Sequence, residues 1–291
     1  MRRPRILLTG AQGQVGHALA RLLPRNGEVI ALDRAALDLA DADAIVAAVR
    51  AAAPDLIINA GAYTAVDAAE QERAVAFAVN AQAPQVLAEE AKRLGALLIH
   101  YSTDYVFDGA ARAPYTEDAP VAPLNVYGES KLEGERAIAA SGAHALTLRT
   151  SWVYGLRGRN FLLTIRRLAA QRPELRIVAD QAGIPNWSVA LAAATNALVA
   201  QGLPSLKART GLYHFSATGA TTWFGFAKAI VGDAPSPVVV PIATAEFPTP
   251  ARRPAYGVLD TSRFAATFGF ALPAWENCLA DCLADDRQAS G

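Results

Sequence analysis

The sequence predicts an α/β fold: a doubly wound parallel sheet followed by a smaller C-terminal lobe. Two observations support this prediction. Short apolar runs alternate with stretches of helical periodicity through the first half of the chain, and a glycine-rich turn joins the first run to the first helix. Strands and helices in alternation indicate parallel β-α-β units, and right-handed crossovers place helices on both faces of such a sheet.

The predicted elements follow one another at a regular rhythm up to about residue 150. The predicted strands are residues 5–9, 28–32, 55–59, 96–100 and 145–148. The predicted helices are residues 15–23, 41–52, 80–94 and 127–140. Beyond residue 150 frequent prolines break the chain into shorter pieces, so we expect a separate lobe there.

Composition narrows the class of partner. The chain has 291 residues, 52% of them hydrophobic, and its 27 Lys and Arg residues balance 27 Asp and Glu residues. A protein that grips nucleic acid or an anionic membrane usually carries a basic excess, so neither partner is expected. No apolar stretch approaches the roughly 20 residues of a membrane span. The two cysteines, Cys278 and Cys282, suggest no disulfide scaffold, and we expect a cytoplasmic protein.

The first turn carries the pattern Gly-x-x-Gly-x-x-Gly at Gly10, Gly13 and Gly16. In a Rossmann fold the first glycine permits a tight turn, the second lets the backbone approach a pyrophosphate, and the third allows close packing of helix on strand. The N-terminus of the following helix offers free N–H groups to phosphates. We therefore expect residues 1–150 to bind NAD(P), and residues 151–291 to form mainly the substrate lobe, from which some segments could return to the first domain.

Other strand ends could also contact the dinucleotide. Asp33 can accept hydrogen bonds from an adenosine ribose, whereas Arg34 could meet the 2′-phosphate of NADP, so the choice between NADPH and NADH stays open. Asp38 either lines the adenine with Leu39 or caps a helix before Ala40. Small residues around Ala62, after the third strand, allow a cofactor to lie close.

The catalytic candidates are Tyr127 and Lys131, in the pattern Tyr-x-x-x-Lys. At this spacing both side chains share one helix face. A nearby ammonium lowers the pKa of a phenol and makes Tyr127 a plausible proton donor to a carbonyl oxygen. A hydroxyl after the fourth strand could polarise that carbonyl, and the residues alone do not decide between Ser102 and Thr103.

Longer motifs are specific enough to indicate a family. They are residues 102–109 (STDYVFDG), 123–128 (PLNVYG), 149–155 (RTSWVYG), 180–185 (DQAGIP), 211–214 (GLYH) and 248–254 (PTPARRP). Together they resemble the dTDP-4-dehydrorhamnose reductases, which are extended short-chain dehydrogenase/reductases. The resemblance covers essentially the whole chain. It implies reduction of the C4 keto group of dTDP-4-dehydro-β-L-rhamnose by NADPH or NADH, the last step of dTDP-L-rhamnose synthesis.

The resemblance also implies roles for individual residues. Thr103, rather than Ser102, is the hydroxyl on the carbonyl, Tyr127 is the proton donor, and Lys131 tunes Tyr127 and holds the nicotinamide ribose. Asp104 and Trp152 match sugar contacts. The positions that match cofactor contacts are Gln12, Gly13, Gln14, Val15, Asp38, Leu39, Ala62, Tyr63 and Thr64.

Some positions depart from the family pattern. Asn186 stands where a threonine usually follows the DQ-x-G-x-P motif, so the sugar pocket could differ slightly. Some members dimerise through magnesium held by glutamates, but Ala18 occupies one such position and residues 181–232 contain no Asp or Glu. Because a hard divalent cation needs oxygen ligands, we predict no metal site and leave a homodimer open.

Three hypotheses remain at this stage. Arg252 or Arg253, in a proline-flanked loop, could meet the dTDP diphosphate, because a guanidinium fork suits phosphate oxygens. The substrate could be another nucleotide-linked 4-keto-6-deoxysugar. The chain also resembles the regulatory β subunit of methionine adenosyltransferase, which would make it a non-catalytic NADP-binding module.

Overall fold

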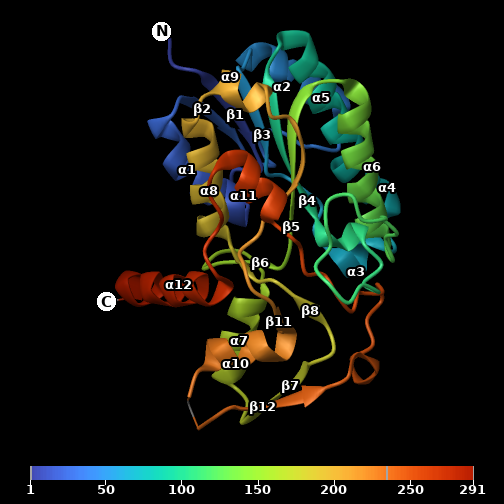
Figure 1. The fold of residues 1–291 in the computed structure, drawn as a ribbon, viewed down its shortest axis with the longest axis vertical. Coiled ribbons are helices and arrows are strands. Elements are labelled where there is room, and N and C mark those ends of the chain that lie inside the picture. The colour runs from blue at the N-terminus through green and yellow to red at the C-terminus, as the bar shows by residue number, and fades with distance from the viewer. Residues whose placement is uncertain (1, 234, 291) are drawn as a thin grey trace.

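The computed structural model describes residues 2–233 and 235–290 of the chain. Its centre is a six-stranded sheet in the order β10-β5-β4-β3-β1-β2, and every neighbouring pair in it is parallel. Figure 1 shows helices α2, α5 and α6 along one side of this sheet and α1, α8 and α11 along the other. The predicted doubly wound α/β fold is therefore confirmed.

The predicted elements of the first half are all present. The strands of the central sheet are β1 (Arg5–Thr9), β2 (Glu28–Leu32), β3 (Leu56–Asn59), β4 (Leu97–Thr103), β5 (His144–Thr150) and β10 (Gly211–His214). The helices that follow the first four of them are α1 (Gln14–Leu22), α2 (Ala42–Ala52), α3 (Val66–Ala69), α4 (Arg73–Phe77), α5 (Ala83–Leu94) and α6 (Val126–Ser141). β4 runs on past its predicted end because Ser102 and Thr103 still pair with β5.

Alternate residues of the strands feed two hydrophobic cores. Ile6 and Leu8 of β1 pack with α1 and α8 (Ser188–Ala200) on one face of the sheet, whereas Leu7 packs with α2 and α5 on the other. All three side chains are fully buried. This burial on both faces explains why the strands read as continuous apolar runs rather than as an alternating pattern.

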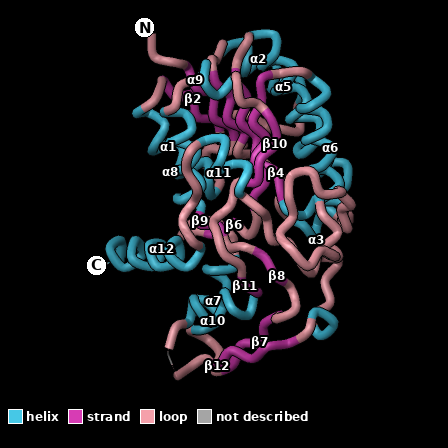
Figure 2. Tube along the Cα trace, in the orientation of Figure 1, coloured by secondary structure: helices cyan, strands magenta, loops and turns pink. Residues whose placement is uncertain are grey.

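The second half builds a smaller lobe below the sheet (Figure 2). Its helices are α7 (Phe161–Ala169), α10 (Trp223–Val231) and α12 (Trp275–Ser290). They pack around Tyr154, Phe226 and Trp275, with both cysteines buried and unpaired in the same core. Short strand pairs β6–β9 (Val153–Tyr154 and Asn186–Trp187), β8–β11 (Ala182–Gly183 and Thr221–Thr222) and β7–β12 (Glu174–Val178 and Val238–Ile242) complete the lobe.

The two halves of the chain interleave in space. β10 forms one edge of the central sheet beside β5, and α8 packs on α1. Short helices α9 (Leu203–Lys207) and α11 (Ser262–Phe268) lie on the same side (Figure 1). Residues 188–215 and 262–268 follow residue 150 in the chain but pack with the first half. The division at residue 150 therefore stays a proposal.

Within the described residues, no helix is both long and apolar enough to cross a membrane. The same part of the chain contains no group of three or more His, Cys, Asp or Glu side chains arranged to hold a metal ion.

Candidate active site

The three glycines of the first turn form a tightly packed cradle. Gly10 has a φ of +66°, and a Cβ atom there would lie 2.5 Å from the backbone nitrogen of Gly61 after β3. A Cβ on Gly16 would lie 2.1 Å from the carbonyl oxygen of Gly10, so only glycine lets α1 pack this close to the turn. Gly13 is exposed, and its N–H donates to the Gly10 oxygen at 2.9 Å. Its backbone is therefore free for close approach by a ligand.

The N-terminus of α1 fits a pyrophosphate. Its N-cap is Gly13, which has no side chain to satisfy the N–H groups of the first turn, and that turn carries no acidic residue. These N–H groups point at whatever occupies the turn, and the helix dipole favours an anion there. The predicted contacts Gln12, Gly13, Gln14 and Val15 lie together at this end. The residues present therefore fit a dinucleotide.

Gln14 also links this turn to the second lobe. Its Oε1 accepts a hydrogen bond from Asn160 Nδ2 at 2.9 Å, and its Nε2 lies 3.5 Å from the carbonyl oxygen of Val153. Asn160 caps α7 by accepting from the N–H of Leu163. The first residue of α1 is thereby joined to the start of a helix in the smaller lobe.

The predicted adenosine contacts lie around the carboxyl end of β2. Asp33 Oδ1 accepts from the N–H groups of Ala35 and Ala36, both at 3.0 Å, and Arg34 is exposed. Asp38 accepts from the Ala40 N–H at 3.0 Å and so does cap a turn, although the N-cap of α2 is Asp41. These bonds do not decide between NADPH and NADH.

Leu39 and residues 62–64 lie beside the glycine cradle. A Cβ on Gly61 would be 2.5 Å from Leu39 Cδ1, so this leucine packs on the loop after β3. Tyr63 of that loop is held by the Asn80 side chain, which accepts from the Tyr63 N–H at 2.9 Å and donates to the Tyr63 oxygen at 3.0 Å. Ala62 and Thr64 on either side are exposed, which leaves this segment open to a ligand.

Helix α6 carries Tyr127 and Lys131 toward the carboxyl end of β4. Asn125 caps α6, accepting from the Gly128 N–H at 2.8 Å. A Cβ on Gly128 would lie 2.2 Å from the Tyr105 oxygen, so this glycine lets the helix approach the segment after β4. The Tyr127 ring meets the Tyr105 ring edge-on, with centroids 5.6 Å apart.

Tyr127 and Thr103 lie in contact, but the electrostatics of Tyr127 differ from expectation. Burial raises the pKa of Tyr127 to about 12, and only its side-chain contact with Thr103 counteracts this. The ammonium of Lys131 is hydrogen-bonded elsewhere: it donates to the Tyr101 oxygen at 2.6 Å and lies 3.2 Å from His100 Nε2. Burial lowers the pKa of Lys131 to about 8.

The structure also separates the two hydroxyls that sequence chemistry left open. Ser102 donates to the carboxylate of Glu135, which is itself paired with Arg149 at 2.6 Å, and all three residues are buried. Thr103 instead contacts Tyr127. Only Thr103 has its hydroxyl beside the predicted proton donor, which supports its assignment over Ser102.

Asp104 is an unusual carboxylate. It is 2% exposed, its Oδ1 accepts from the Thr103 hydroxyl at 3.1 Å, and its Oδ2 has no hydrogen-bond partner within residues 2–233 and 235–290. Burial raises its pKa to about 7. A Cβ on Gly257 would come within 2.4 Å of Oδ2, so this carboxylate abuts the backbone of the second half of the chain. A buried carboxylate oxygen left free beside Thr103 and Tyr127 suits a ligand hydroxyl.

Trp152 is held in a strained backbone conformation at the junction of the two halves. Its φ is +40°, a region that residues other than glycine rarely adopt. The indole stacks on Trp223 with centroids 3.5 Å apart, and a Cβ on Gly183 would be 2.5 Å from its Cε2. Strain of this kind is typical of ligand clamps, which supports the predicted sugar contact.

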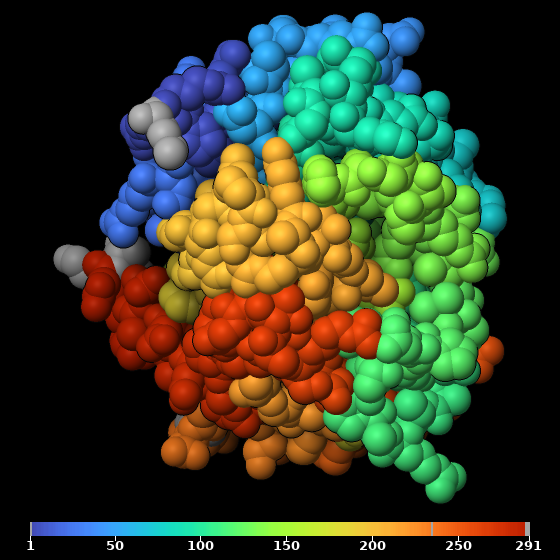
Figure 3. All heavy atoms as spheres, turned by 45° about the horizontal axis from the view of Figure 1, so that its top comes forward, coloured from blue at the N-terminus to red at the C-terminus, as the bar shows by residue number. Residues whose placement is uncertain are grey.

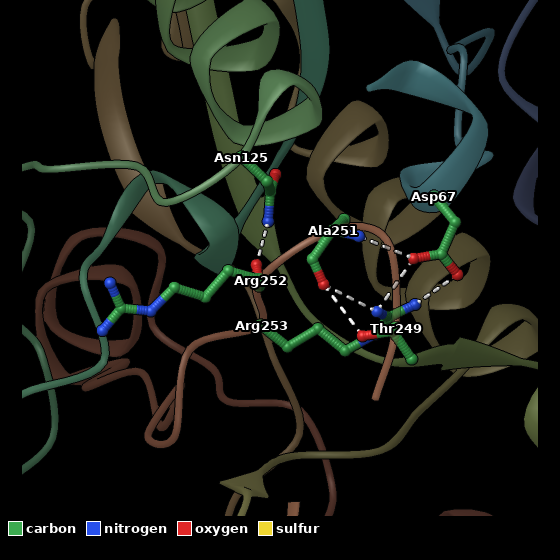
Figure 4. Close-up of polar contacts among 6 residues, drawn as sticks. All are labelled: Asp67, Asn125, Thr249, Ala251, Arg252 and Arg253. Atoms are coloured by element: carbon green, nitrogen blue, oxygen red, sulfur yellow. Dashed lines mark hydrogen bonds and ion pairs between the residues drawn. The ribbon is translucent and has the colours of Figure 1, made fainter. Parts of the chain in front are cut away.

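Arg253 is engaged within the protein. Its Nη1 and Nη2 donate to the two carboxylate oxygens of Asp67 on α3, at 3.0 and 2.8 Å, and Nη1 also donates to the Ala251 oxygen. Figure 4 shows Arg253 turned toward Asp67 while the Arg252 side chain extends the other way. The Asn125 cap of α6 donates to the Arg252 oxygen at 2.7 Å. The loop is therefore fastened to both α3 and α6.

Asn186, the departure from the family pattern, is a structural residue here. It is 1% exposed; its Nδ2 donates to the oxygens of Ser151 and Ile184 and to Ser216 Oγ, and its Oδ1 accepts from the Ala217 N–H at 2.7 Å. The whole amide is thus used to join neighbouring segments, and none of it is left for a sugar.

Three participants in this arrangement were missed by sequence reasoning. His100 is the partner of Lys131, Asp67 is the partner of Arg253, and Trp223 stacks on Trp152. Asp67 and Trp223 lie far along the chain from their partners and carry no local signal. His100 stands in a predicted apolar strand, and a histidine there is itself a signal that could have been followed.

A separate cleft of about 440 Å³ lies between α6, β5 and β10, and none of the candidate site residues lines it. It is visible in Figure 3 as a hollow between the green helix and the gold segment near β10. The candidate site is instead at the carboxyl ends of β1 to β4, where doubly wound sheets bind their ligands.

A glycine cradle for a dinucleotide, with Tyr127, Lys131 and Thr103 beside it, defines a nicotinamide-dependent oxidoreductase of the short-chain dehydrogenase/reductase kind. Comparisons with known proteins narrow this class. The model of the RmlD substrate binding domain matches residues 4–288. The chain belongs to that family, the dTDP-4-dehydrorhamnose reductases.

Individual relatives agree with this assignment. A dTDP-4-dehydrorhamnose reductase of Burkholderia thailandensis is 47% identical over 97% of this chain and 98% of its own length. The crystal structure of a dTDP-4-dehydrorhamnose reductase from Bacillus anthracis in complex with NADP has a TM-score of 0.91 and 36% identity, covering 98% of this chain and 100% of that one. A probable dTDP-4,6-dihydroxy-2-methyloxan-3-one 4-ketoreductase of Streptomyces antibioticus is 40% identical over 97% of this chain and 95% of its own.

Proposed function

We propose that this protein reduces the C4 keto group of dTDP-4-dehydro-β-L-rhamnose with NADPH or NADH, giving dTDP-L-rhamnose. The observation that carries the proposal is the contact between Tyr127 and Thr103 at the carboxyl end of β4. Because β1, β3 and β4 are parallel neighbours, this contact lies at the same end of the sheet as the glycine cradle after β1. The names and coverage of the relatives support the substrate and the place of the reaction as the last step of dTDP-rhamnose synthesis.

The residues of the site divide the work of a carbonyl reduction. A bound reduced nicotinamide supplies the hydride that reaches the carbonyl carbon. Tyr127 gives its phenolic proton to the carbonyl oxygen, which completes the alcohol; its raised pKa keeps it protonated at neutral pH and ready to act as the acid. Thr103 donates a hydrogen bond to the same oxygen, and Lys131 stabilises the phenolate that Tyr127 becomes.

Further residues are proposed to bind the two ligands. The cofactor contacts are Gly10, Gln12, Gly13, Gln14, Val15, Gly16, Asp33, Arg34, Asp38, Leu39, Ala62, Tyr63, Thr64, Tyr127 and Lys131. The substrate contacts are Thr103, Asp104, Trp152 and Arg253. The Arg253 guanidinium is already paired with Asp67, so it would have to bind a phosphate and this carboxylate at the same time.

A second candidate substrate is another nucleotide-linked 4-keto-6-deoxysugar. It is favoured by the Streptomyces antibioticus relative, whose name gives a different 4-ketoreduction. The two candidates share the same chemistry at C4 and differ in the sugar presented to Asp104 and Trp152. We also propose a cytoplasmic location and leave a homodimer to be tested by sedimentation.

The experiment is to follow oxidation of NADPH and of NADH with dTDP-4-dehydro-β-L-rhamnose, for the wild type and Tyr127→Phe. We expect turnover by the wild type and a loss of about a hundredfold or more in the variant, because a proton donor has been removed. The comparison of the two cofactors decides between the roles of Asp33 and Arg34. A folded wild type that binds NADPH but turns over no 4-keto sugar nucleotide would overturn the proposal and favour a non-catalytic NADP-binding regulator.

A further inference from the structure

A buried chain of hydrogen bonds lies behind Lys131 and crosses three strands of the sheet. Thr9 Oγ1 of β1 lies 2.7 Å from Asn59 Oδ1 of β3, Asn59 Nδ2 lies 3.0 Å from His100 Nδ1 of β4, and His100 Nε2 lies 3.2 Å from Lys131 Nζ. All four residues are at most 2% exposed. Their polar atoms must therefore be satisfied by protein groups rather than by bulk water.

The protons along this chain are fixed by what Lys131 can do. An ammonium has three donors and no acceptor, so His100 Nε2 must accept from it and carry no hydrogen. A neutral imidazole then bears its single hydrogen on Nδ1, facing Asn59. Rotating the Asn59 amide by 180° exchanges its nitrogen and oxygen without moving the side chain. The amide oxygen then accepts from the His100 Nδ1 hydrogen, and the amide nitrogen donates to the Thr9 hydroxyl.

His100 is held in the neutral form that this arrangement requires. Burial lowers its pKa well below the usual value, and the positive charge of Lys131 lowers it further. The Tyr101 oxygen accepts a second hydrogen bond from Lys131 at 2.6 Å. Two of the three ammonium donors are thus occupied by β4, and one is left for the candidate active site.

We propose that His100 is a positioning residue for the reduction: its Nε2 accepts from the Lys131 ammonium and, with the Tyr101 carbonyl, directs the remaining donor toward Tyr127 and the cofactor ribose. The role rests on the proposed function, since it acts through Lys131. It also stabilises the charged form of Lys131, because a hydrogen bond to the charged form of a group favours that form.

The surroundings of Lys131 make such support necessary. Burial lowers its pKa to about 8, and the charge that opposes this effect is Glu135 on the same helix. The Glu135 carboxylate is already bound to Arg149 of β5 and to Ser102 of β4. Tyr127 on the preceding turn stays protonated, since burial raises its pKa. His100 and the Tyr101 oxygen are therefore the neutral acceptors that hold the ammonium.

Two substitutions at His100 separate the hydrogen bond from the packing. His100→Leu keeps the approximate size of the side chain but removes the acceptor. His100→Gln can instead place an amide oxygen near the position of Nε2. His214→Leu is the matched control, because His214 is also fully buried and its ring contacts the Asp260 oxygen through Nδ1 at 3.1 Å, whereas its Nε2 has no partner among the described residues. NADPH binding and thermal unfolding of each variant report on folding separately from turnover.

The readout is the pH dependence of kcat for the 4-keto sugar nucleotide. We expect His100→Leu to lower kcat by about tenfold, less than the loss of Tyr127, and to move the alkaline limb down by about one pH unit, because the Lys131 ammonium is lost sooner. His100→Gln should recover most of both effects, and His214→Leu should leave the limb in place. An unmoved limb in His100→Leu, or equal limbs in the Leu and Gln variants, overturns the proposal.

A second measurement does not depend on turnover. Nitrogen-15 NMR of the histidine rings in the free wild-type protein identifies the tautomer of each ring, and loss of one signal in His100→Gln assigns it. We expect the hydrogen of His100 on Nδ1, the less common tautomer. A hydrogen on Nε2 would overturn the proposal even if the enzyme is active, whereas an inactive wild type with hydrogen on Nδ1 would count against the proposed function alone.

Discussion

The guanidinium of Arg253 donates to both carboxylate oxygens of Asp67, and this pair fastens a loop of the C-terminal half to helix α3 of the N-terminal half. Asp67 also accepts from the Ala251 N–H at 3.1 Å, so it binds the loop by side chain and backbone alike. The Arg253 side chain is 22% exposed, which leaves one part of it in reach of a ligand.

The pair predicts different results for its two members. Arg253→Ala should raise KM for the nucleotide sugar by about tenfold, because a diphosphate loses a charged partner and the loop is loosened. Asp67→Asn should raise KM by a smaller factor, because it only loosens the loop. Steady-state kinetics of both single variants and of the double variant measure this. Equal effects in the two single variants would show that Arg253 acts through the pair alone, and an unchanged KM in Arg253→Ala would remove it from the site.

Asp104 makes stability depend on pH. Its folded-state pKa of about 7 exceeds the usual value, so the unfolded chain ionises first as pH rises. The burial of Asp104 does not lower the unfolding free energy below about pH 4, and its destabilising effect grows as pH rises to about pH 7. Asp104→Asn should therefore be more stable than the wild type at about pH 8, by about 4 kcal/mol, and no more stable at about pH 4. Turnover should fall in the same variant.

Urea unfolding across this pH range is the measurement, and Asp108→Asn is its control. Asp108 lies on the same segment, but the Ala110 N–H and then the Tyr115 hydroxyl lower the pKa of its carboxyl. Its contribution has the opposite sign: it is present at neutral pH and lost as pH falls. A stability gain in Asp104→Asn that is the same at all pH values would contradict the burial argument.

How much could be predicted depended on how local the signal was. Gly10, Gly13 and Gly16 lie within the turn and first residues that join β1 to α1, and Tyr127 and Lys131 lie one helical turn apart on α6, so local spacing was enough to predict these placements. The electrostatics of Tyr127 could not be read this way, because burial depends on segments from elsewhere in the chain. The short β10 joins the sheet without a periodic pattern, since four residues are too few to show one.

We expect Asn186, which differs from the threonine usual in the family, to contribute to folding stability rather than to sugar binding. Asn186→Ala leaves the buried Ala217 N–H and the Ser151 oxygen without partners, and each such group costs about 1–3 kcal/mol. We expect a loss of about 3 kcal/mol in unfolding free energy with little change in KM. Asn196→Ala is the control: this half-buried asparagine accepts one side-chain hydrogen bond, from Asn26. A tenfold or larger rise in KM for Asn186→Ala, at unchanged stability, would instead place this residue in the sugar pocket.

Two alanine substitutions in the glycine cradle should separate packing from ligand binding. A Cβ on Gly16 would lie 2.1 Å from the Gly10 oxygen, which forces α1 away from the turn, whereas one on Gly13 would lie 3.1 Å from the same oxygen and extend toward solvent. Gly16→Ala should therefore cost about 2 kcal/mol of stability without any ligand. Gly13→Ala should unfold almost as the wild type does but bind NADPH about tenfold more weakly, since its methyl group occupies the place of the pyrophosphate. Thermal unfolding with and without NADPH measures both effects, and wild-type NADPH affinity in Gly13→Ala would show that the dinucleotide does not approach the turn at this residue.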